Sequence, residues 1–298
     1  MTDEFKPKTD QRLIELYDEY AHGQIDRREF MRRAGALAVG GVSAAALAQS
    51  MLPQYALAQT ISFTDPRLRG SYTEYPSPNG SGTVRGYFVR PVRESATPAP
   101  GVLVIHENRG LNPYIEDVAR RLAIEGFLAL APDGLSTLGG YPGNDDEGRE
   151  MQARIPAEQL KQDMIAGARF LKGHAECTGK LAAIGFCWGG GMVNTLAIEF
   201  GDALDAGVPF YGPQPAASDV ARITAPLLIH YGELDTRINA GWAAFETALQ
   251  AHRIEHTMHM YAGANHGFHN DSTPRYDEQA ATLAWDRTVT FLRQHLQA

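Results

Sequence analysis

The stretch Gly185-Phe186-Cys187-Trp188-Gly189 decides the fold expected for this chain. It follows the short apolar run 181–184, which is typical of a buried parallel strand. It precedes residues 188–200, which are small at first and then mostly apolar, and which favour a helix packed tightly beneath a turn. A nucleophile on such a turn has a strained backbone and close neighbours, so glycine is needed on both sides of it. The stretch therefore predicts a nucleophile elbow, with cysteine in place of the commoner serine. The alternative is a buried structural cysteine beside a glycine-rich helix start.

Two later residues supply the other groups that an elbow nucleophile needs. In α/β-hydrolases the chain order is nucleophile, carboxylate, histidine. Asp235 ends the apolar run that begins at Pro226, and His266 lies in a loop after the strand-like residues 255–261. Each gap leaves room for about one βα unit, so all three side chains can reach the same edge of a sheet. The alternative for His266 is a loop histidine without a role.

Strand-like and helix-like patterns alternate through most of the chain. This alternation predicts an α/β fold, with a mostly parallel central sheet and helices on both of its faces. Residues 68–75 and 83–89, joined by turn-forming residues, predict an antiparallel hairpin at the sheet edge. Residues 134–155 are rich in glycine and acidic residues, and we expect a loop or partial cap there. Cys177 is expected in the loop before the elbow strand.

The N-terminal part of the chain has the features of an export signal. Arg27 and Arg28 belong to a twin-arginine-like motif, and no charged residue occurs from Ala34 to Thr64. The small residues 56–58 match a signal cleavage site. We therefore predict a signal segment over residues 1–58 and a periplasmic domain over residues 59–298, which meets the membrane only transiently during export. The alternative is a transmembrane anchor, which the polar and glycine residues of this region disfavour.

The composition excludes several classes of partner and bound group. The formal net charge of −8 and the pI near 5.7 argue against nucleic acid as a partner. The only cysteines, Cys177 and Cys187, are too few for a disulfide framework or a structural zinc site. The pair His256 and His259 would face opposite sides of a strand, and the pair His266 and His269 lacks a third ligand nearby. We predict no metal and no cofactor.

Four separated motifs resemble the dienelactone hydrolase family, over about residue 68 to the C-terminus. They are His106-Glu107-Asn108-Arg109-Gly110, the cysteine elbow, Gly232-Glu233-Leu234-Asp235 and His266-Gly267-Phe268. The resemblance implies a triad of Cys187, His266 and Asp235, and a small-molecule ester or lactone as substrate. It also implies that Glu107 contacts the resting thiol and that the backbone N–H groups of Asn108 and Trp188 form an oxyanion hole. The alternative for Glu107 is a carboxylate that caps the following helix.

The motifs depart from the family in the arginines that hold a substrate carboxylate. Family members that act on dienelactone have an arginine just after the histidine, whereas here none follows His266 before Arg275. We therefore expect a broader ester or lactone specificity. Two other classes of function stay open, a redox protein that uses Cys187 and Cys177 and a non-catalytic binding protein on the same scaffold. The sequence makes no prediction of the oligomeric state.

Overall fold

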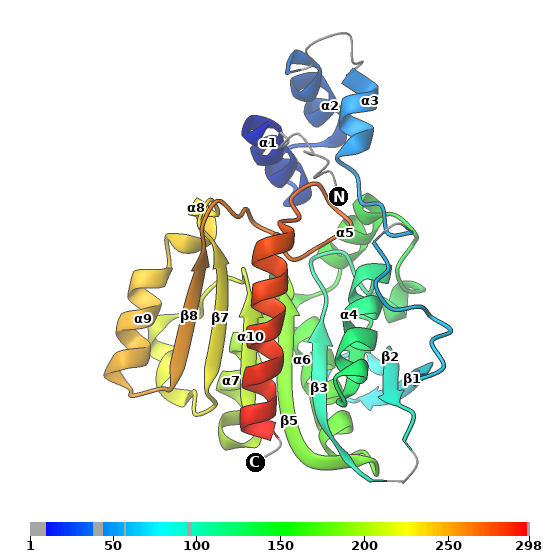
Figure 1. Ribbon diagram of the computed structural model, residues 1–298, viewed down its shortest axis with the longest axis vertical. Coiled ribbons are helices and arrows are strands. Elements are labelled where there is room, and N and C mark those ends of the chain that lie inside the picture. Colours follow the sequence, from blue (N-terminus) through cyan, green and yellow to red (C-terminus); the bar gives the residue numbers. More distant parts are fainter. Residues whose placement is uncertain (1–9, 38–43, 57, 94–96, 297–298) are drawn as a thin grey trace, which may run out of the picture.

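One sheet of eight strands forms the centre of the fold (Figure 1). The protein is described by a computed structural model, which covers residues 10–37, 44–56, 58–93 and 97–296. The strands are β1 (Leu68–Ser77), β2 (Gly82–Pro91), β3 (Ala99–Ile105), β4 (Leu128–Pro132), β5 (Cys177–Phe186), β6 (Ala206–Phe210), β7 (Leu227–Gly232) and β8 (His256–Tyr261). Their order in the sheet is β1-β2-β4-β3-β5-β6-β7-β8. β1, β2 and β4 pair antiparallel and the remaining neighbours pair parallel, so the predicted hairpin and the mostly parallel sheet are confirmed.

Helices cover both faces of the sheet, as the sequence predicts. α4 (Pro113–Ile124) and α10 (Glu278–Leu296) pack on one face, and α6 (Ala157–Lys172), α7 (Trp188–Phe200) and α9 (Trp242–Ala251) pack on the other. Successive residues of β3 show why both faces are covered. Val102 and Val104 belong to the core beneath α4, while Leu103 and Ile105 belong to the core beneath α6. A strand that is buried on both sides is apolar throughout, which explains the continuous run in the sequence.

Two local predictions need correction. Within residues 134–155, where a loop or partial cap was expected, the structure has a helix, α5 (Asp145–Ala153). Its N-cap, Asn144, accepts a hydrogen bond from the Glu147 backbone N–H at 2.9 Å, and the acidic first turn suits the positive end of the helix dipole. The acidic residues thus mark a helix start rather than a loop. Cys177 is the first residue of β5, not part of the preceding loop.

Three N-terminal helices stand above the carboxyl ends of the parallel strands (Figure 1). They are α1 (Gln11–Ala21), α2 (Arg27–Ala36) and α3 (Ala44–Ser50). They share a small apolar core in which the rings of Tyr17, Tyr20 and Phe30 pack against one another. The part of the chain that the structure describes contains no helix that is both long and apolar enough to cross a membrane.

The predicted signal segment therefore includes helices that pack on the sheet domain. Residues 38–43 of its predicted apolar region, and Leu57 at its predicted cleavage site, lie outside the described residues. Removal of residues 1–58 stays a prediction.

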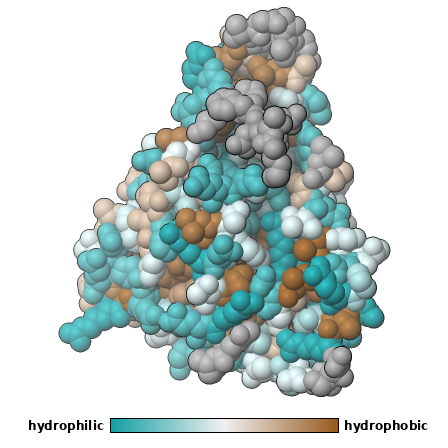
Figure 2. Space-filling view, in the orientation of Figure 1, coloured by the Kyte–Doolittle hydropathy of each residue, from teal (hydrophilic) through white to brown (hydrophobic). Residues whose placement is uncertain are grey.

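The visible surface carries apolar residues in separate groups among hydrophilic ones (Figure 2). Such scattered apolar groups are normal on a globular protein, because its surface contains many apolar atoms. Ligands of open α/β sheets bind instead at the carboxyl ends of the strands. A ligand site is therefore expected at the carboxyl edge of the sheet, beneath the N-terminal helices.

Candidate active site

The structure places Cys187 on a strained turn between β5 and α7. Its backbone has φ 54° and ψ −115°, outside the regions that residues with a side chain usually adopt. A Cβ atom on Gly185 would lie 2.1 Å from the Gly189 carbonyl oxygen, and one on Gly189 would lie 2.3 Å from the Ile105 carbonyl oxygen. Neither position has room for a side chain, because β5, α7 and β3 meet there backbone to backbone. The glycines on both sides of the cysteine have the steric role that the sequence predicted.

Asp235 and His266 lie together at the carboxyl edge of the sheet. Asp235 follows β7 and caps the short helix α8 (Thr236–Asn239), accepting from the Ile238 N–H at 3.2 Å. Its other carboxylate oxygen lies 2.5 Å from His266 Nδ1. This contact fixes the proton on Nδ1 and leaves Nε2 as the atom that faces the rest of the site. Nε2 is buried and has no hydrogen-bond partner among the described residues.

The predicted nucleophile, base and carboxylate are thus brought together. Cys187 Sγ lies within 4.8 Å of a ring nitrogen of His266. Cys187 and His266 are both buried, with 8% and 4% of their surfaces exposed. A general base needs this proximity, although its hydrogen bond to the nucleophile is often long before substrate binds.

A second histidine, which the sequence analysis did not single out, also contacts the thiol. His22, the C-cap of α1, has its Nε2 atom 3.5 Å from Cys187 Sγ. Its Nδ1 atom lies 2.8 Å from the Asp18 carbonyl oxygen and 3.3 Å from the Asp18 carboxylate. The rings of His22 and His266 meet edge to face, with centroids 4.7 Å apart. His22 escaped prediction because it lies in the segment assigned to the export signal, more than a hundred residues before the elbow.

The charges around Cys187 favour its thiolate. Burial alone raises the pKa of Cys187, but the positive charge of His266 and the hydrogen bond with His22 outweigh it, so the pKa lies well below the ordinary thiol value. Burial lowers the pKa of His266, whereas the charges of Cys187 and Asp235 raise it, and the net shift is upward. Burial likewise lowers the pKa of His22, and its hydrogen bonds with Asp18 and Cys187 raise it further than burial lowers it. The site therefore favours a thiolate beside protonated imidazole, the pairing that activates a cysteine nucleophile.

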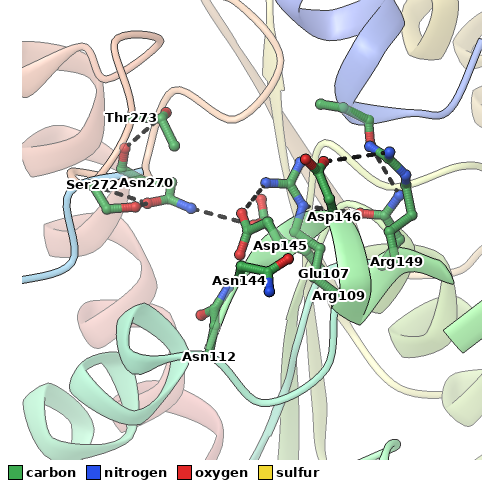
Figure 3. Close-up of polar contacts among 12 residues, drawn as sticks. Glu107, Arg109, Asn112, Asn144, Asp145, Asp146, Arg149, Asn270, Ser272 and Thr273 are labelled. Carbon is green, nitrogen blue, oxygen red and sulfur yellow. Dashed lines mark hydrogen bonds and ion pairs between the residues drawn. The ribbon is translucent and has the colours of Figure 1, made fainter. Parts of the chain in front are cut away.

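Glu107 differs from the expectation. Its buried carboxylate accepts a hydrogen bond from Asn270 Nδ2 at 3.2 Å, and Asn270 in turn accepts from the Ser272 hydroxyl (Figure 3). The expected contact was with the resting thiol, whereas the Cys187 sulfur lies 3.5 Å from Nε2 of His22. The helix-cap alternative is not supported either, because Asn112 caps α4 by accepting from the Ile115 N–H at 3.1 Å.

The expected oxyanion-hole residues lie on two different elements, Trp188 at the start of α7 and Asn108 after β3. Trp188 is the first residue of α7, so its N–H belongs to the helix-start donors that have no partner within the helix. Asn108 follows β3, and its side-chain Nδ2 donates to the Ala21 carbonyl oxygen of α1 at 3.3 Å. His106 packs against Trp188 with ring centroids 5.4 Å apart, and its Nε2 accepts from the Gly134 N–H at 3.1 Å. These contacts hold the loop after β3 beside the elbow.

Folding places Arg275 beside the loop that carries His266. Arg275 is buried, and a Cβ atom on Gly267 would lie 2.8 Å from its Cζ atom. Its Nη1 donates to the Asp18 carboxylate of α1 at 3.0 Å, and its Nε has no partner among the described residues. Arg237, just after Asp235, lies 3.4 Å from His266 Nδ1 and 2.9 Å from His22 Nε2. The sequence suggested that no arginine lay near the histidine, because it counted neighbours along the chain rather than in space.

The N-terminal helices cover this site through several contacts, here called the cap interface. Besides His22 and Asp18, Gln11 donates to Asn265 at 2.7 Å, and Tyr20 donates to the carboxylate of Asp146 on α5. Arg149 Nη1 donates to the Tyr20 carbonyl oxygen at 2.7 Å and pairs with Asp146 (Figure 3). A cavity of about 190 Å³ remains between α1 and the loops of Asp235 and His266. His22 of α1 contacts Sγ from the side of the N-terminal helices.

The two cysteines lie too far apart for a disulfide. Both are free, with Cys177 at the start of β5 and Cys187 just beyond its end. A strand rises about 3.3 Å per residue, which separates the two by roughly 30 Å, whereas disulfide Cα atoms lie within about 7 Å. The structure therefore excludes the disulfide between Cys177 and Cys187 that a redox protein of this kind would use.

Comparisons with known proteins agree with the fold and identify the family. A model described as the dienelactone hydrolase family matches residues 84–296, and a second, described as YqhI-like, matches residues 1–39. Protein usf of Aquifex pyrophilus is 35% identical over 227 residues, which cover 72% of this chain and 94% of that protein. A protein of Bradyrhizobium sp., whose name designates a 2-oxo-3-(5-oxofuran-2-ylidene)propanoate lactonase, is 33% identical over 70% of this chain and 89% of its own length.

A solved structure is also similar. The crystal structure of P91 from metagenomic libraries, described as a dienelactone hydrolase-like promiscuous phosphotriesterase, has a TM-score of 0.66 and 26% identity. It covers 77% of this chain and 99% of its own, so the likeness spans the sheet domain.

Proposed function

Because the chain belongs to the dienelactone hydrolase family, and is an ester or lactone hydrolase of that kind, we propose that it works through Cys187, His266 and Asp235 and a thioester acyl-enzyme. The observation that carries this proposal is the unpartnered Nε2 atom of His266, which faces the elbow thiol while Asp235 holds the opposite ring nitrogen.

A residue of the site can be assigned to each step of the proposed reaction. The Cys187 thiolate attacks the substrate carbonyl carbon, and the carbonyl oxygen takes the negative charge. Backbone N–H groups of Trp188 and Asn108 stabilise that oxyanion. Protonated His266 gives its proton to the leaving alkoxide, and the acyl group stays on sulfur as a thioester. His266 then takes a proton from water, the hydroxide attacks the thioester, and the acid product leaves with the thiolate restored.

The cations at the site favour a substrate that carries a carboxylate. Arg275 and Arg237 both lie by the histidine loop, and in this structure a carboxylate, that of Asp18, already pairs with Arg275. Arginine binds carboxylates in fixed, often bidentate geometry. The lactonase designated for the Bradyrhizobium relative has such an anionic lactone in its name. Ester or lactone substrates with a free carboxylate are therefore the first to test, in place of the broader ester or lactone specificity expected from sequence.

Export offers a role for the cap interface, which would keep Cys187 covered until the signal segment is removed. If the chain leaves by the twin-arginine route and is cut after Ala58, α1 to α3 are removed and His22 no longer covers Cys187. The precursor would then be a covered, weakly active form, and the periplasmic enzyme would be open. Mass spectrometry of the periplasmic fraction should find a mature N-terminus at Gln59. An intact chain found in the cytoplasm alone would contradict both export and this activation.

Substitution of each cysteine tests the proposed nucleophile. Turnover of p-nitrophenyl acetate should be abolished in Cys187→Ala and nearly unchanged in Cys177→Ala, because Cys177 lies at the opposite end of β5. Equal loss in both variants would contradict the assignment. A wild-type protein that binds lactones and esters without turning any of them over would favour the non-catalytic binding protein.

A further inference from the structure

Three potential metal ligands meet where α1 lies on the elbow. They are His22 of α1, Cys187 of the elbow and His266 of the histidine loop, and one ligand atom of each lies within 4.8 Å of the others. The Cys187 Sγ to His22 Nε2 separation is 3.5 Å. Zinc bonds of about 2.3 Å to sulfur and about 2.0 Å to nitrogen, in tetrahedral geometry, place neighbouring ligand atoms about 3.5 Å apart. The first pair already has that spacing, and the ligand atoms of all three residues lie within 4.8 Å of one another.

Both histidines are held as zinc-binding histidines are. In such sites the ring nitrogen that does not bind metal donates to a carboxylate or carbonyl, which fixes the ring and increases its basicity. Here His266 Nδ1 lies 2.5 Å from the Asp235 carboxylate, and His22 Nδ1 lies 2.8 Å from the Asp18 carbonyl oxygen and 3.3 Å from its carboxylate. The Nε2 atoms of both rings are left to face the sulfur.

The chemistry of the three groups also suits a thiophilic divalent cation. His266 Nε2 is buried without a hydrogen-bond partner among the described residues, so a ligand atom points into the cluster unused. A thiolate with two imidazoles is a donor set that zinc prefers, and it leaves a fourth position for water. An incoming cation takes the place of the imidazole protons, which are released to solvent.

One cation competes for the same space. Arg237 Nη2 lies 2.9 Å from His22 Nε2, so its guanidinium has to move when a metal binds. Its side chain is exposed, which allows it to turn into solvent.

We propose that the capped chain binds one zinc-like divalent cation through His22 Nε2, Cys187 Sγ and His266 Nε2. The cation fastens α1 to the nucleophile, and by using the thiolate and the base as ligands it stops hydrolysis. The sequence predicted no metal, because His22 joins the other two only through folding. The binding site stands on the geometry alone, whereas its inhibitory effect rests on the function proposed above.

Cobalt(II) titration of the full-length, metal-free protein tests the site without using activity. Binding of one Co²⁺ should give a sulfur-to-cobalt charge-transfer band and the visible bands of tetrahedral cobalt. Cys187→Ser should lose the charge-transfer band, and His22→Ala should weaken Co²⁺ and Zn²⁺ binding by at least about 100-fold, the upper range seen for loss of outer-shell partners. The matched control is His252→Ala, an exposed histidine at the end of α9, which should bind as the wild type does.

Two further measurements distinguish failure of the metal site from failure of the proposed function. Arg237→Gln should bind Co²⁺ more tightly than the wild type, because it removes the cation beside His22 Nε2. An increase in affinity cannot be explained by a loosened cap, whereas the loss in His22→Ala could be. Zn²⁺ should inhibit p-nitrophenyl acetate turnover, and a chelator should restore it. Wild-type protein without a charge-transfer band, or His22→Ala with unchanged affinity, overturns the metal site. Cobalt binding as expected in the full-length chain, together with no hydrolase activity in the chain that begins at Gln59, overturns the proposed function and leaves the metal site standing.

Discussion

Replacement of Tyr20 by phenylalanine should loosen the cap interface without touching the reacting groups. The Tyr20 ring is buried in the small core of α1 and α2, and its hydroxyl donates to the Asp146 carboxylate on α5. Phenylalanine keeps the ring packing and removes only this hydrogen bond. Neither Tyr20 nor Asp146 contacts Cys187, so a change in thiol behaviour has to come from the cap.

The size of the effect follows from the kind of bond that is lost. A hydrogen bond to a charged group contributes about 1.5–3 kcal/mol, and a partly exposed acceptor reduces that value. The Asp146 side chain is 26% exposed and keeps Arg27 and Arg149 as partners, so we take about 1–2 kcal/mol. A loss of that size increases the open fraction of a mostly closed cap by about 5- to 30-fold.

The assay is alkylation of Cys187 by iodoacetamide in the full-length chain, followed by peptide mapping, together with p-nitrophenyl acetate turnover. Both rates should rise by the same factor in Tyr20→Phe. The matched control is Tyr72→Phe, an exposed tyrosine of β1 whose hydroxyl donates to the Glu116 carboxylate of α4, which should leave both rates unchanged. Unchanged or slower alkylation in Tyr20→Phe would refute the idea that α1 blocks the nucleophile.

Three shorter predictions test the site itself. Gly189→Ala should abolish activity and lower the melting temperature, because its Cβ atom would lie 2.3 Å from the Ile105 carbonyl oxygen; a fully active variant would contradict the close contact of α7 with β3. The rate of Cys187 alkylation should not fall as the pH is lowered below about 8.5, because the pKa of this thiol lies below the ordinary value. A rate profile with its midpoint at or above that pH would contradict an ion pair between the Cys187 thiolate and His266. Glu107→Gln should leave Cys187 alkylation unchanged, because Asn270 is the recorded hydrogen-bond partner of that carboxylate; faster alkylation would support the thiol-suppressing role expected from sequence.

The sequence was informative wherever a function requires a local pattern. The elbow at Cys187 and the strand-end carboxylate Asp235 could be predicted because strand, turn and glycine positions lie within a few residues of one another. The hairpin of β1 and β2 was predictable for the same reason, from a turn between two alternating runs. The prediction of a loop at residues 134–155 was wrong because an acidic helix start and an acidic loop have similar compositions, and the Asn144 cap distinguishes them.

What the sequence could not supply were contacts between distant segments. His22 and Asp18 belong to a stretch whose composition suggests a signal, and no short-range pattern connects them with residues 187 or 275. Arg275 likewise comes back to His266 only because its loop folds over Gly267. Glu107 was given a thiol contact through family resemblance, whereas its neighbours in space decide that it meets Asn270.

The most direct test of the central claim is to trap the acyl-enzyme. Wild-type protein is mixed with p-nitrophenyl acetate, quenched in acid within one turnover, digested and mapped by mass spectrometry. The account predicts one acetyl group on the peptide that contains Cys187, removable by hydroxylamine as a thioester, and no acetyl group on that peptide in Cys187→Ala. His266→Ala should slow both the appearance and the loss of the label. Rapid hydrolysis with the acetyl group on another residue, or undiminished turnover in Cys187→Ala, would contradict the claim that Cys187 is the nucleophile.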